Sequence, residues 1–279
     1  MHYGVAIFPT ESGMAPDELG RALEERGFES LWVAEHTHIP AERRSPYPGG
    51  GELPRQYYET LDPFVALTAA ATATTRLKVA TGICLVVERD PIITAKEVAS
   101  LDVVSDGRFL FGVGGGWNAE EMENHGTPFE RRWKVMRERI EAMQAIWSHE
   151  PAEYHGEFVD FDPIHQLPKP RQTPRPPIHV GGGRGGARRA ARYGDGWLPI
   201  AGRDELDDPA AVLAEEAARV GRDPAELEIS IYFAPQDAAA LGRLAEGGVH
   251  RAVFGLPPDP AERQLPRLDR LAALIDEVG

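Results

Sequence analysis

Residues 176–199 read PPIHVGGGRGGARRAARYGDGWLP, and the fold of the chain is decided around this stretch. Its pattern predicts a buried strand over 178–181, a glycine turn, a helix and a second strand that starts at Gly196. Backbone N–H groups in such a turn, next to a helix N-terminus, form a site for an anion. The stretch therefore predicts a phosphorylated cofactor. The helix adds local positive charge through Arg184, Arg188, Arg189 and Arg192.

Short apolar runs alternate with helical patterns along the whole chain, as in a parallel α/β fold. Several runs are apolar at consecutive positions, which is expected of strands that are buried on both faces. Eight strand–helix units predict a TIM (β/α)8 barrel, formed by a single domain over residues 1–279. The predicted strands cover residues 3–8, 30–34, 77–85, 108–113, 178–181, 196–200, 228–234 and 251–256.

Two segments interrupt this alternation. Residues 39–60 are polar, rich in Pro and Gly, and contain Tyr57 and Tyr58. Because they follow the second strand, we expect them to lie over the C-terminal face, where barrel enzymes have their active sites. Residues 150–176 contain YHGEFVDF and a proline-rich run. They predict an inserted hairpin or lid before the fifth strand.

Gly181, Gly183 and Gly186 also match the GxGxxG pattern of dinucleotide-binding proteins, and Asp204 lies about twenty residues further on. A Rossmann dehydrogenase is therefore an alternative. That motif normally occupies the first βα turn, whereas four βα units precede it here. The position favours a barrel loop that binds a phosphate. A turn that only joins two elements stays open as a third interpretation.

Charge and composition limit the partners. A net charge of −14 should repel DNA, RNA and anionic lipid, so we expect neither a nucleic acid nor a membrane partner. The only cysteine, Cys84, excludes an intrachain disulfide and fits a reducing, cytoplasmic setting. The sequence shows no apolar run of membrane-spanning length and no signal-peptide pattern. The expected partner is a small-molecule substrate.

A second glycine turn, residues 112–116, follows the fourth strand. In a barrel the fourth and fifth strands are neighbours, so this turn and the one at Gly181 should meet at one mouth and share a ligand. Trp117 either packs under the turn or stacks on a ligand. Asn118 either caps the next helix or forms a hydrogen bond to a cofactor.

Glu35 and His36 end the second strand, at the position where barrel enzymes place catalytic groups. His36 can exchange a proton near neutral pH, and a structural role is the alternative. Glu35, His36 and His38 raise the question of a metal ion. Because no HxxxH motif or carboxylate triad completes the set, no metal site is predicted.

Four segments, in this order, resemble the luciferase-like monooxygenase superfamily, and most closely its coenzyme F420-dependent oxidoreductases. The resemblance covers nearly the whole chain. It implies a TIM barrel, usually a homodimer, that holds F420, or alternatively FMN, at its C-terminal mouth. The segments are GFESLWVAEH, LKVATGICLVVERDPIITAKEVASLDVVSDGRFLFGVGGGWNAEEM, YHGEFVDF with PKP, and PPIHVGGGRGGARRAARYGDGWLP.

The resemblance also implies roles for residues. Residues 182–185 would hold the phosphate and residues 114–116 would line the opposite wall. Ile83 and Cys84 match a bulge where the family often has a non-prolyl cis peptide bond behind the ring. Glu35 and His36 would face the ring and the substrate. The complete predicted cofactor site is Ile83, Cys84, Gly114, Gly115, Gly116, Asn118, Gly181, Gly182, Gly183, Arg184 and Gly185.

Together these inferences predict an F420-dependent oxidoreductase that transfers a hydride between the deazaflavin C5 and a small organic substrate. His36 would donate or accept the accompanying proton, and Glu35 would orient a ring or substrate group. The main alternative is an FMN-dependent monooxygenase that uses O₂. A cofactor-binding protein without enzymatic activity is a further alternative.

Overall fold

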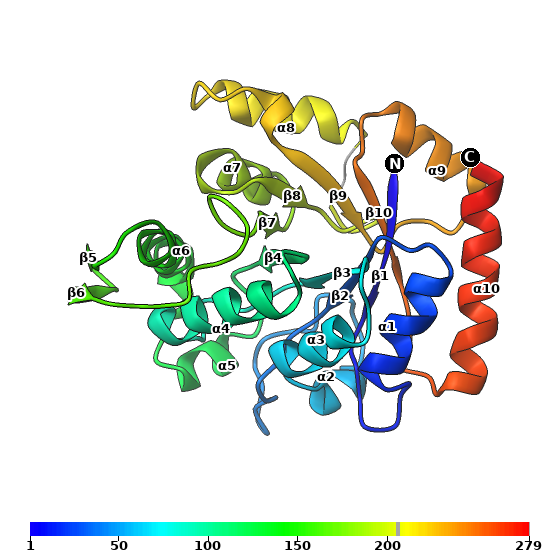
Figure 1. Cartoon of the computed structure of the whole chain (residues 1–279), viewed down its shortest axis with the longest axis horizontal. Helices are drawn as coiled ribbons and strands as arrows, with labels where there is room; N and C mark the ends of the chain where they lie inside the picture. The colour runs from blue at the N-terminus through cyan, green and yellow to red at the C-terminus, as the bar shows by residue number, and fades with distance from the viewer. Residues whose placement is uncertain (205–206, 279) are drawn as a thin grey trace.

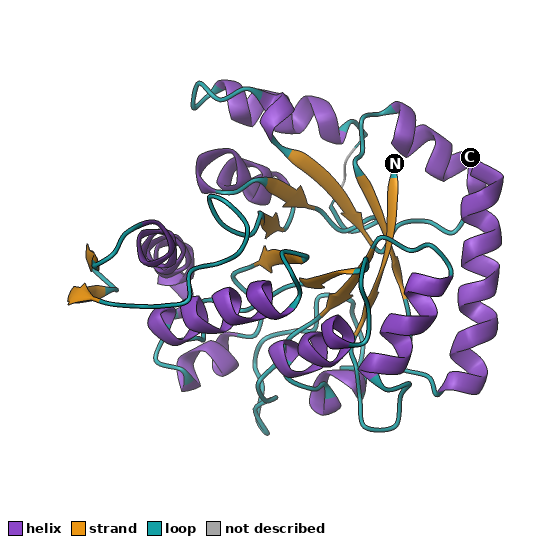
Figure 2. Ribbon diagram, viewed as in Figure 1, coloured by secondary structure: helices purple, strands orange, loops and turns teal. Residues whose placement is uncertain are grey.

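The predicted strands form a closed parallel barrel, so the prediction of a TIM barrel is confirmed. In the computed structural model, which describes residues 1–204 and 207–278, the strand order is β1-β2-β3-β4-β7-β8-β9-β10, and β10 closes on β1. Helices surround this barrel (Figure 1), and Figure 2 separates helix from strand in the same view. The Rossmann alternative is wrong, because a Rossmann sheet is open.

The barrel strands are short. Their bounds are β1 His2–Ile7, β2 Ser30–Val33, β3 Lys78–Thr81, β4 Phe109–Val113, β7 Ile178–Gly181, β8 Gly196–Leu198, β9 Glu228–Tyr232 and β10 Arg251–Gly255. The longer helices are α1 Pro16–Glu25, α3 Pro63–Thr72, α4 Pro91–Val104, α6 Arg132–Ser148, α7 Arg184–Tyr193, α8 Pro209–Ala218, α9 Ala238–Glu246 and α10 Ala261–Val278. Shorter helical segments are α2 Gln56–Glu59, α5 Ala119–Asn124, and the 3-10 turns Phe129–Arg131 and Pro224–Glu226.

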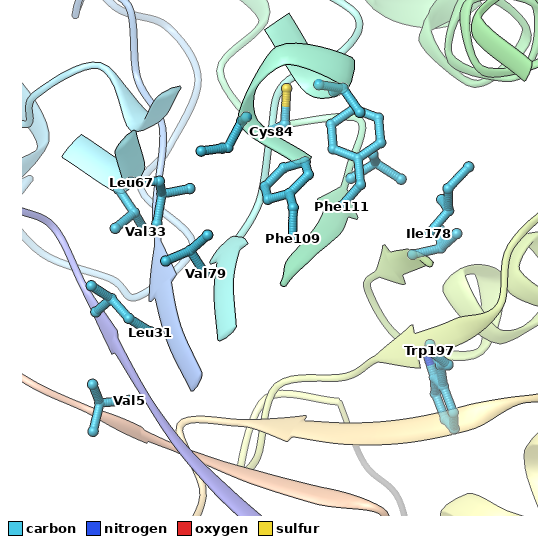
Figure 3. Packing of buried hydrophobic residues seen from close by; sticks show 14 of the residues in the cluster. Val5, Leu31, Val33, Leu67, Val79, Cys84, Phe109, Phe111, Ile178 and Trp197 are labelled. Carbon is cyan, nitrogen blue, oxygen red and sulfur yellow. The ribbon is translucent and has the colours of Figure 1, made fainter. Parts of the chain in front are cut away.

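Consecutive strand residues alternate between the barrel interior and the layer beneath the helices. In β1, Val5 belongs to the outer layer and Ala6 to the interior. Figure 3 shows part of the outer layer, where Phe109 and Phe111 of β4 lie with their ring centroids 5.9 Å apart. Because side chains fill the interior, we expect a ligand to bind to the loops at the strand ends. The interior set is Ala6, Trp32, Ala80, Leu110, Leu198, Tyr232 and Val253.

Asp-Pro pairs begin several of the helices. At α3, Asp62 accepts hydrogen bonds from two backbone N–H groups, and Asp90 does the same at α4. The proline that follows occupies the first helical position, where its missing N–H costs nothing. Asp208 and Asp223 cap α8 and a 3-10 turn by accepting from one backbone N–H group each.

The insertion before the fifth barrel strand is a hairpin, not a lid. β5 (Ala152–His155) and β6 (Asp160–Ile164) pair antiparallel. The Tyr154 hydroxyl donates to Glu141 of α6 at 2.8 Å, which fixes the hairpin on the outside of that helix. Figure 1 accordingly shows β5 and β6 beyond α6, at the edge of the molecule. The lid alternative for residues 150–176 is therefore wrong.

The insertion after β2 does reach the C-terminal face. It carries α2 and returns to the barrel through a bridge between Thr10 and Thr60. The ring centroid of Tyr57 lies 4.4 Å from that of Phe8 and 5.2 Å from that of His36. Phe8 and His36 follow the carboxyl ends of β1 and β2, so the segment lies over the mouth, as predicted.

The third strand is shorter than the predicted range 77–85. β3 ends at Thr81, a cis peptide bond joins Gly82 and Ile83, and Cys84 pairs with Val113 as an isolated parallel bridge. The apolar residues 84–87 that follow are buried, so they resemble a strand in sequence without forming one. Within the part of the chain that the structure describes, no helix is both long and apolar enough to cross a bilayer.

Candidate active site

His36 and Glu121 form a buried pair at the carboxyl end of β2. His36 Nδ1 lies 2.7 Å from Glu121 Oε2, and the two side chains are 6% and 0% exposed. The N–H of Thr37 donates to Glu121 Oε1 at 3.0 Å, and Asn118 Nδ2 donates to Oε2 at 3.3 Å. Because an ionised carboxylate only accepts, Nδ1 carries a hydrogen in this pair. The other ring nitrogen, Nε2, is then available to exchange a proton.

Glu121 is a site residue that the sequence reasoning missed. It lies in the first turn of α5, where an acidic side chain is usually explained by the helix dipole. Asn118 precedes α5, yet its side chain contacts Glu121 and does not cap the helix. The capping alternative for Asn118 is therefore wrong. Its predicted contact with a cofactor stays a prediction.

Aromatic rings form a wall around His36. The centroid of Trp117 lies 5.8 Å from that of His36, and the ring of Tyr57, in the insertion after β2, lies 5.2 Å from it. The Tyr57 hydroxyl donates to the hydroxyl of Tyr47 at 3.3 Å. Burial and this neighbouring phenol raise the pKa of Tyr57 far above its ordinary value, so it stays a neutral donor. The wall suits a planar or apolar ligand.

Glu35 lies in a different environment from His36. One oxygen accepts the N–H of Leu85 at 2.6 Å, and the other accepts Nε of Arg89 at 2.6 Å. The residue is only 4% exposed. Arg89 also pairs with two further carboxylates, those of Asp62 and Glu97. These contacts hold the segment after β3 in place, and none of them supports the predicted contact between Glu35 and a ligand.

The glycine turn after β4 is packed against side chains of the protein itself. A Cβ at Gly114 would lie 2.0 Å from Ile83 Cδ1, and one at Gly115 would lie 2.4 Å from the ring of Trp133. Arg189 lies over the same ring, with its guanidinium carbon 3.4 Å from the centroid. The two glycines are thus required by internal packing. Their predicted place in a cofactor wall, with that of Gly116, stays a prediction.

Ile83 brings the two predicted turns together. Its Cδ1 lies against Gly114, and its Cγ2 is 3.3 Å from the Cβ position of Gly181. The adjacent Cys84 is fully buried, and burial raises the pKa of its thiol well above the ordinary range. The structure therefore confirms that the turns meet at one mouth. A buried, neutral thiol is not a reactive one.

The turn after β7 has open space at Gly182, whereas side chains of the protein pack against the turn after β4. Gly182 has φ of +106°, and a Cβ there would meet no atom within 4 Å. The N–H of Gly186 donates to the carbonyl of Gly183. Among the described residues, the N–H groups of residues 183–185 have no protein acceptor. Free N–H groups at the N-terminus of a ten-residue helix fit an anionic group such as a phosphate.

One carboxylate opposes an anion at this turn. Asp204 Oδ1 lies 3.0 Å from the Cβ position of Gly183, and its Oδ2 accepts the N–H of Ile200 at 2.9 Å. A phosphate on the turn would face this negative charge. Asp204 thus lies beside the glycine turn of a barrel. The Rossmann alternative required it to bind the ribose of a dinucleotide instead.

The arginines of α7 are mostly committed to other groups. Arg184 donates to Glu215 and, at 3.1 Å, to Glu216 of α8, and Arg188 donates to Glu216 at 3.2 Å. The expected positive patch is therefore partly neutralised by α8. The predicted contact between Arg184 and a phosphate stays a prediction. Within residues 1–204 and 207–278, no group of three or more His, Cys, Asp or Glu side chains is placed to hold a metal ion.

Comparison with known sequences identifies relatives of the chain. An uncharacterised protein of Mycobacterium tuberculosis is 41% identical over 99% of both chains. An F420-dependent hydroxymycolic acid dehydrogenase of the same species is 27% identical over 94% of this chain and 71% of its own length.

Solved structures share the fold. A monooxygenase, RslO1 from Streptomyces bottropensis, superimposes with a TM-score of 0.80 at 20% identity and 99% coverage of both chains. An F420-dependent secondary alcohol dehydrogenase, solved with an F420-acetone adduct, superimposes with a TM-score of 0.78 at 20% identity over the whole of both chains. The model of the luciferase-like monooxygenase family matches residues 14–274, and the chain therefore belongs to that family.

Proposed function

We propose that the protein is an F420-dependent oxidoreductase that transfers a hydride between the deazaflavin C5 and a small organic substrate. The observation that carries the proposal is the buried pair of His36 and Glu121, next to an aromatic wall at the barrel mouth. The choice of F420 is supported by a relative of 27% identity whose name states that cofactor dependence. Membership of the family supports oxidoreductase chemistry in general.

The residues present fit a planar, phosphorylated cofactor. The free N–H groups of residues 183–185 would bind the phosphate, and Ile83 would lie beneath the ring between the two glycine turns. Asp204 weakens this phosphate site without closing it. When bound, F420 supplies the hydride donor or acceptor, and the protein supplies position, exclusion of water and charge.

His36 would exchange the proton that accompanies the hydride. Glu121 fixes the imidazole by accepting from Nδ1, and its charge stabilises the imidazolium when Nε2 takes a proton. A positioned general acid or base of this kind contributes a factor of about 10²–10⁴ to the rate. In this proposal Glu35 positions the segment after β3, because its carboxylate accepts from the N–H of Leu85 and from Arg89.

The choice of cofactor is tested by binding. We expect recombinant protein titrated with oxidised F420 to show a saturable spectral change, with FMN binding more weakly. Tight binding of FMN with no binding of F420 would overturn the proposal.

The proton-exchanging pair is tested by kinetics. With oxidised F420 and a panel of small alcohols, His36→Gln and Glu121→Gln should each lower kcat about 100-fold or more while cofactor affinity is kept. The control is His38→Gln, because the half-buried His38 contacts the side chains of Thr37 and Asn124 and not Glu121. Full turnover by His36→Gln would remove His36 from the chemistry.

An FMN-dependent monooxygenase is the second candidate. The description of the family and the fold of the Streptomyces monooxygenase favour it. Faster consumption of O₂ by reduced FMN in the presence of the protein than in its absence would support this alternative.

A further inference from the structure

A second buried carboxylate, that of Glu88, lies near the proposed catalytic pair and takes no part in it. Glu88 follows the third strand and is 7% exposed. Its Oε1 lies 4.0 Å from the Cβ position of Gly116, beneath the glycine turn that leads to α5. Its Oε2 is buried and, within the described part of the chain, has no hydrogen-bond partner.

The surroundings of Glu88 and Glu121 differ in the number of donors. Glu121 accepts from three groups, namely His36 Nδ1, the N–H of Thr37 and Asn118 Nδ2. Glu88 Oε2 accepts from none of the described residues. Hydrogen bonds to a carboxylate stabilise its charged form, and burial without them favours the neutral acid. When two buried acids differ in this way, their environments assign the charge to one and the proton to the other.

The charges that face Glu88 point the same way. The carboxylates of Glu121, on α5, and of Glu35, at the end of β2, oppose its ionisation, whereas Arg89 and Arg139 favour it. Arg89 is already shared by three other carboxylates. Arg139 of α6 donates to the carbonyl of Val86 at 3.0 Å. Burial, followed by the charge of Glu121, raises the pKa of Glu88 to about 9.

We propose that Glu88 sets the charge of the proposed catalytic pair: it stays un-ionised beneath the glycine turn and so leaves the negative charge beside His36 to Glu121. Glu88 is a positioning residue in this scheme, because it acts through Glu121 and not on a ligand. The inference rests on the proposed role of the pair, but the protonation of Glu88 can be measured without cofactor or substrate. Its failure is therefore distinguishable from failure of the proposed function.

The first test is infrared spectroscopy of the whole, ligand-free chain. The difference spectrum of wild type minus Glu88→Gln at neutral pH should contain the carbonyl band of a protonated carboxylic acid. The matched control is Glu138→Gln, because Glu138 is also buried but accepts the N–H of Phe158 at 2.6 Å. Its difference spectrum should lack that band. A carboxylate band in the Glu88 spectrum would overturn the proposal.

The second test follows stability against pH. A folded-state pKa of about 9, above the ordinary value of 4.5, means that the folded chain binds more protons between these two pH values. This contribution to stability is complete below the lower value and is lost as pH rises toward the upper one. Glu88→Gln should remove about one proton from the uptake that accompanies folding at pH 7. An unchanged pH dependence of the urea midpoint would contradict the neutral state.

The third test measures the coupling to His36. In ¹⁵N-labelled histidine spectra, assigned with His36→Gln, the His36 resonances of the wild type should shift as Glu88 ionises near pH 9. In Glu88→Gln, the chemical shifts of these His36 resonances should not change with pH near pH 9. Equal behaviour of the two proteins would show that Glu88 does not set the charge of the pair.

Discussion

The two glycine turns of the mouth have similar sequences and opposite surroundings. In the turn after β4, positions 114 and 115 are filled from below by Ile83 and Trp133. In the turn after β7, Gly182 has open space where a Cβ would lie, and the N–H groups of residues 183–185 have no acceptor among the described residues. In the turn after β4, glycine is required because side chains of the protein occupy the space of a Cβ. In the turn after β7, that space is open at Gly182.

This difference separates two reasons for glycine that a sequence pattern merges. Where a glycine is required by close packing, the cost of replacing it depends on the neighbouring side chain. A smaller neighbour should therefore lower that cost. Where a glycine is required by a positive φ, any other residue strains the backbone, and changing the neighbours does not relieve that strain. Substitutions at the two turns should therefore respond differently to a second mutation.

The largest effect is expected at the packed turn. Gly115→Ala places a methyl group against the rigid ring of Trp133, and overpacking of this kind costs about 1–3 kcal/mol of unfolding free energy. In a Trp133→Leu background the same substitution should cost much less. Urea unfolding of the four proteins gives the coupling as a double-mutant cycle. An equal cost in both backgrounds would remove the packing explanation.

A smaller effect is expected at the open turn. Gly182→Ala meets no neighbouring atom, so its cost is the backbone strain of a positive φ, about 1 kcal/mol. The control is Gly185→Ala, whose closest neighbour is Nη1 at the far end of the long Arg189 side chain, 3.2 Å away, and which adds a better helix former to α7. It should be neutral or stabilising in the same urea experiment. If Gly182→Ala were equally neutral, φ at this position would not be constrained.

The smallest effect is expected from the carboxylate beside the open turn. Asp204→Asn keeps an acceptor for the N–H of Ile200 but removes a negative charge next to Gly183. Removing one partly screened charge is worth about 0.5–1 kcal/mol, so a phosphorylated cofactor should bind about two- to five-fold more tightly. Asp207→Asn, in the same segment, is the control for net charge. Unchanged or weaker binding would mean that the phosphate lies elsewhere.

Much of the fold was readable because it depends on local patterns. The alternation of apolar runs with helical patterns predicted the barrel, and all eight strands form within or next to their predicted ranges. The errors fall where two structures share one pattern. Residues 84–87 are as apolar as a strand because they are buried, although they form none. Residues 150–176 fit the pattern of a hairpin and that of a lid equally well.

The site was less predictable, because its pairs are distant in sequence. His36 could be selected from its place at a strand end, but its partner Glu121 lies 85 positions away. Adjacency suggested Glu35 instead, and the alternation of side chains along an extended chain sends that carboxylate to Arg89. Likewise, Arg184 can be located beside a phosphate turn from sequence, yet only packing of α7 on α8 brings Glu216 to it.

The sequence by itself determined the order of strands and helices, the family and the two glycine turns, since each is written in contiguous residues. Tertiary structure decided which turn is filled, which carboxylate meets His36 and which buried acid lacks donors. The physical reason is that charge and space at a site depend on every element packed there. For Glu88 these come from the ends of two strands, from α5 and from α6.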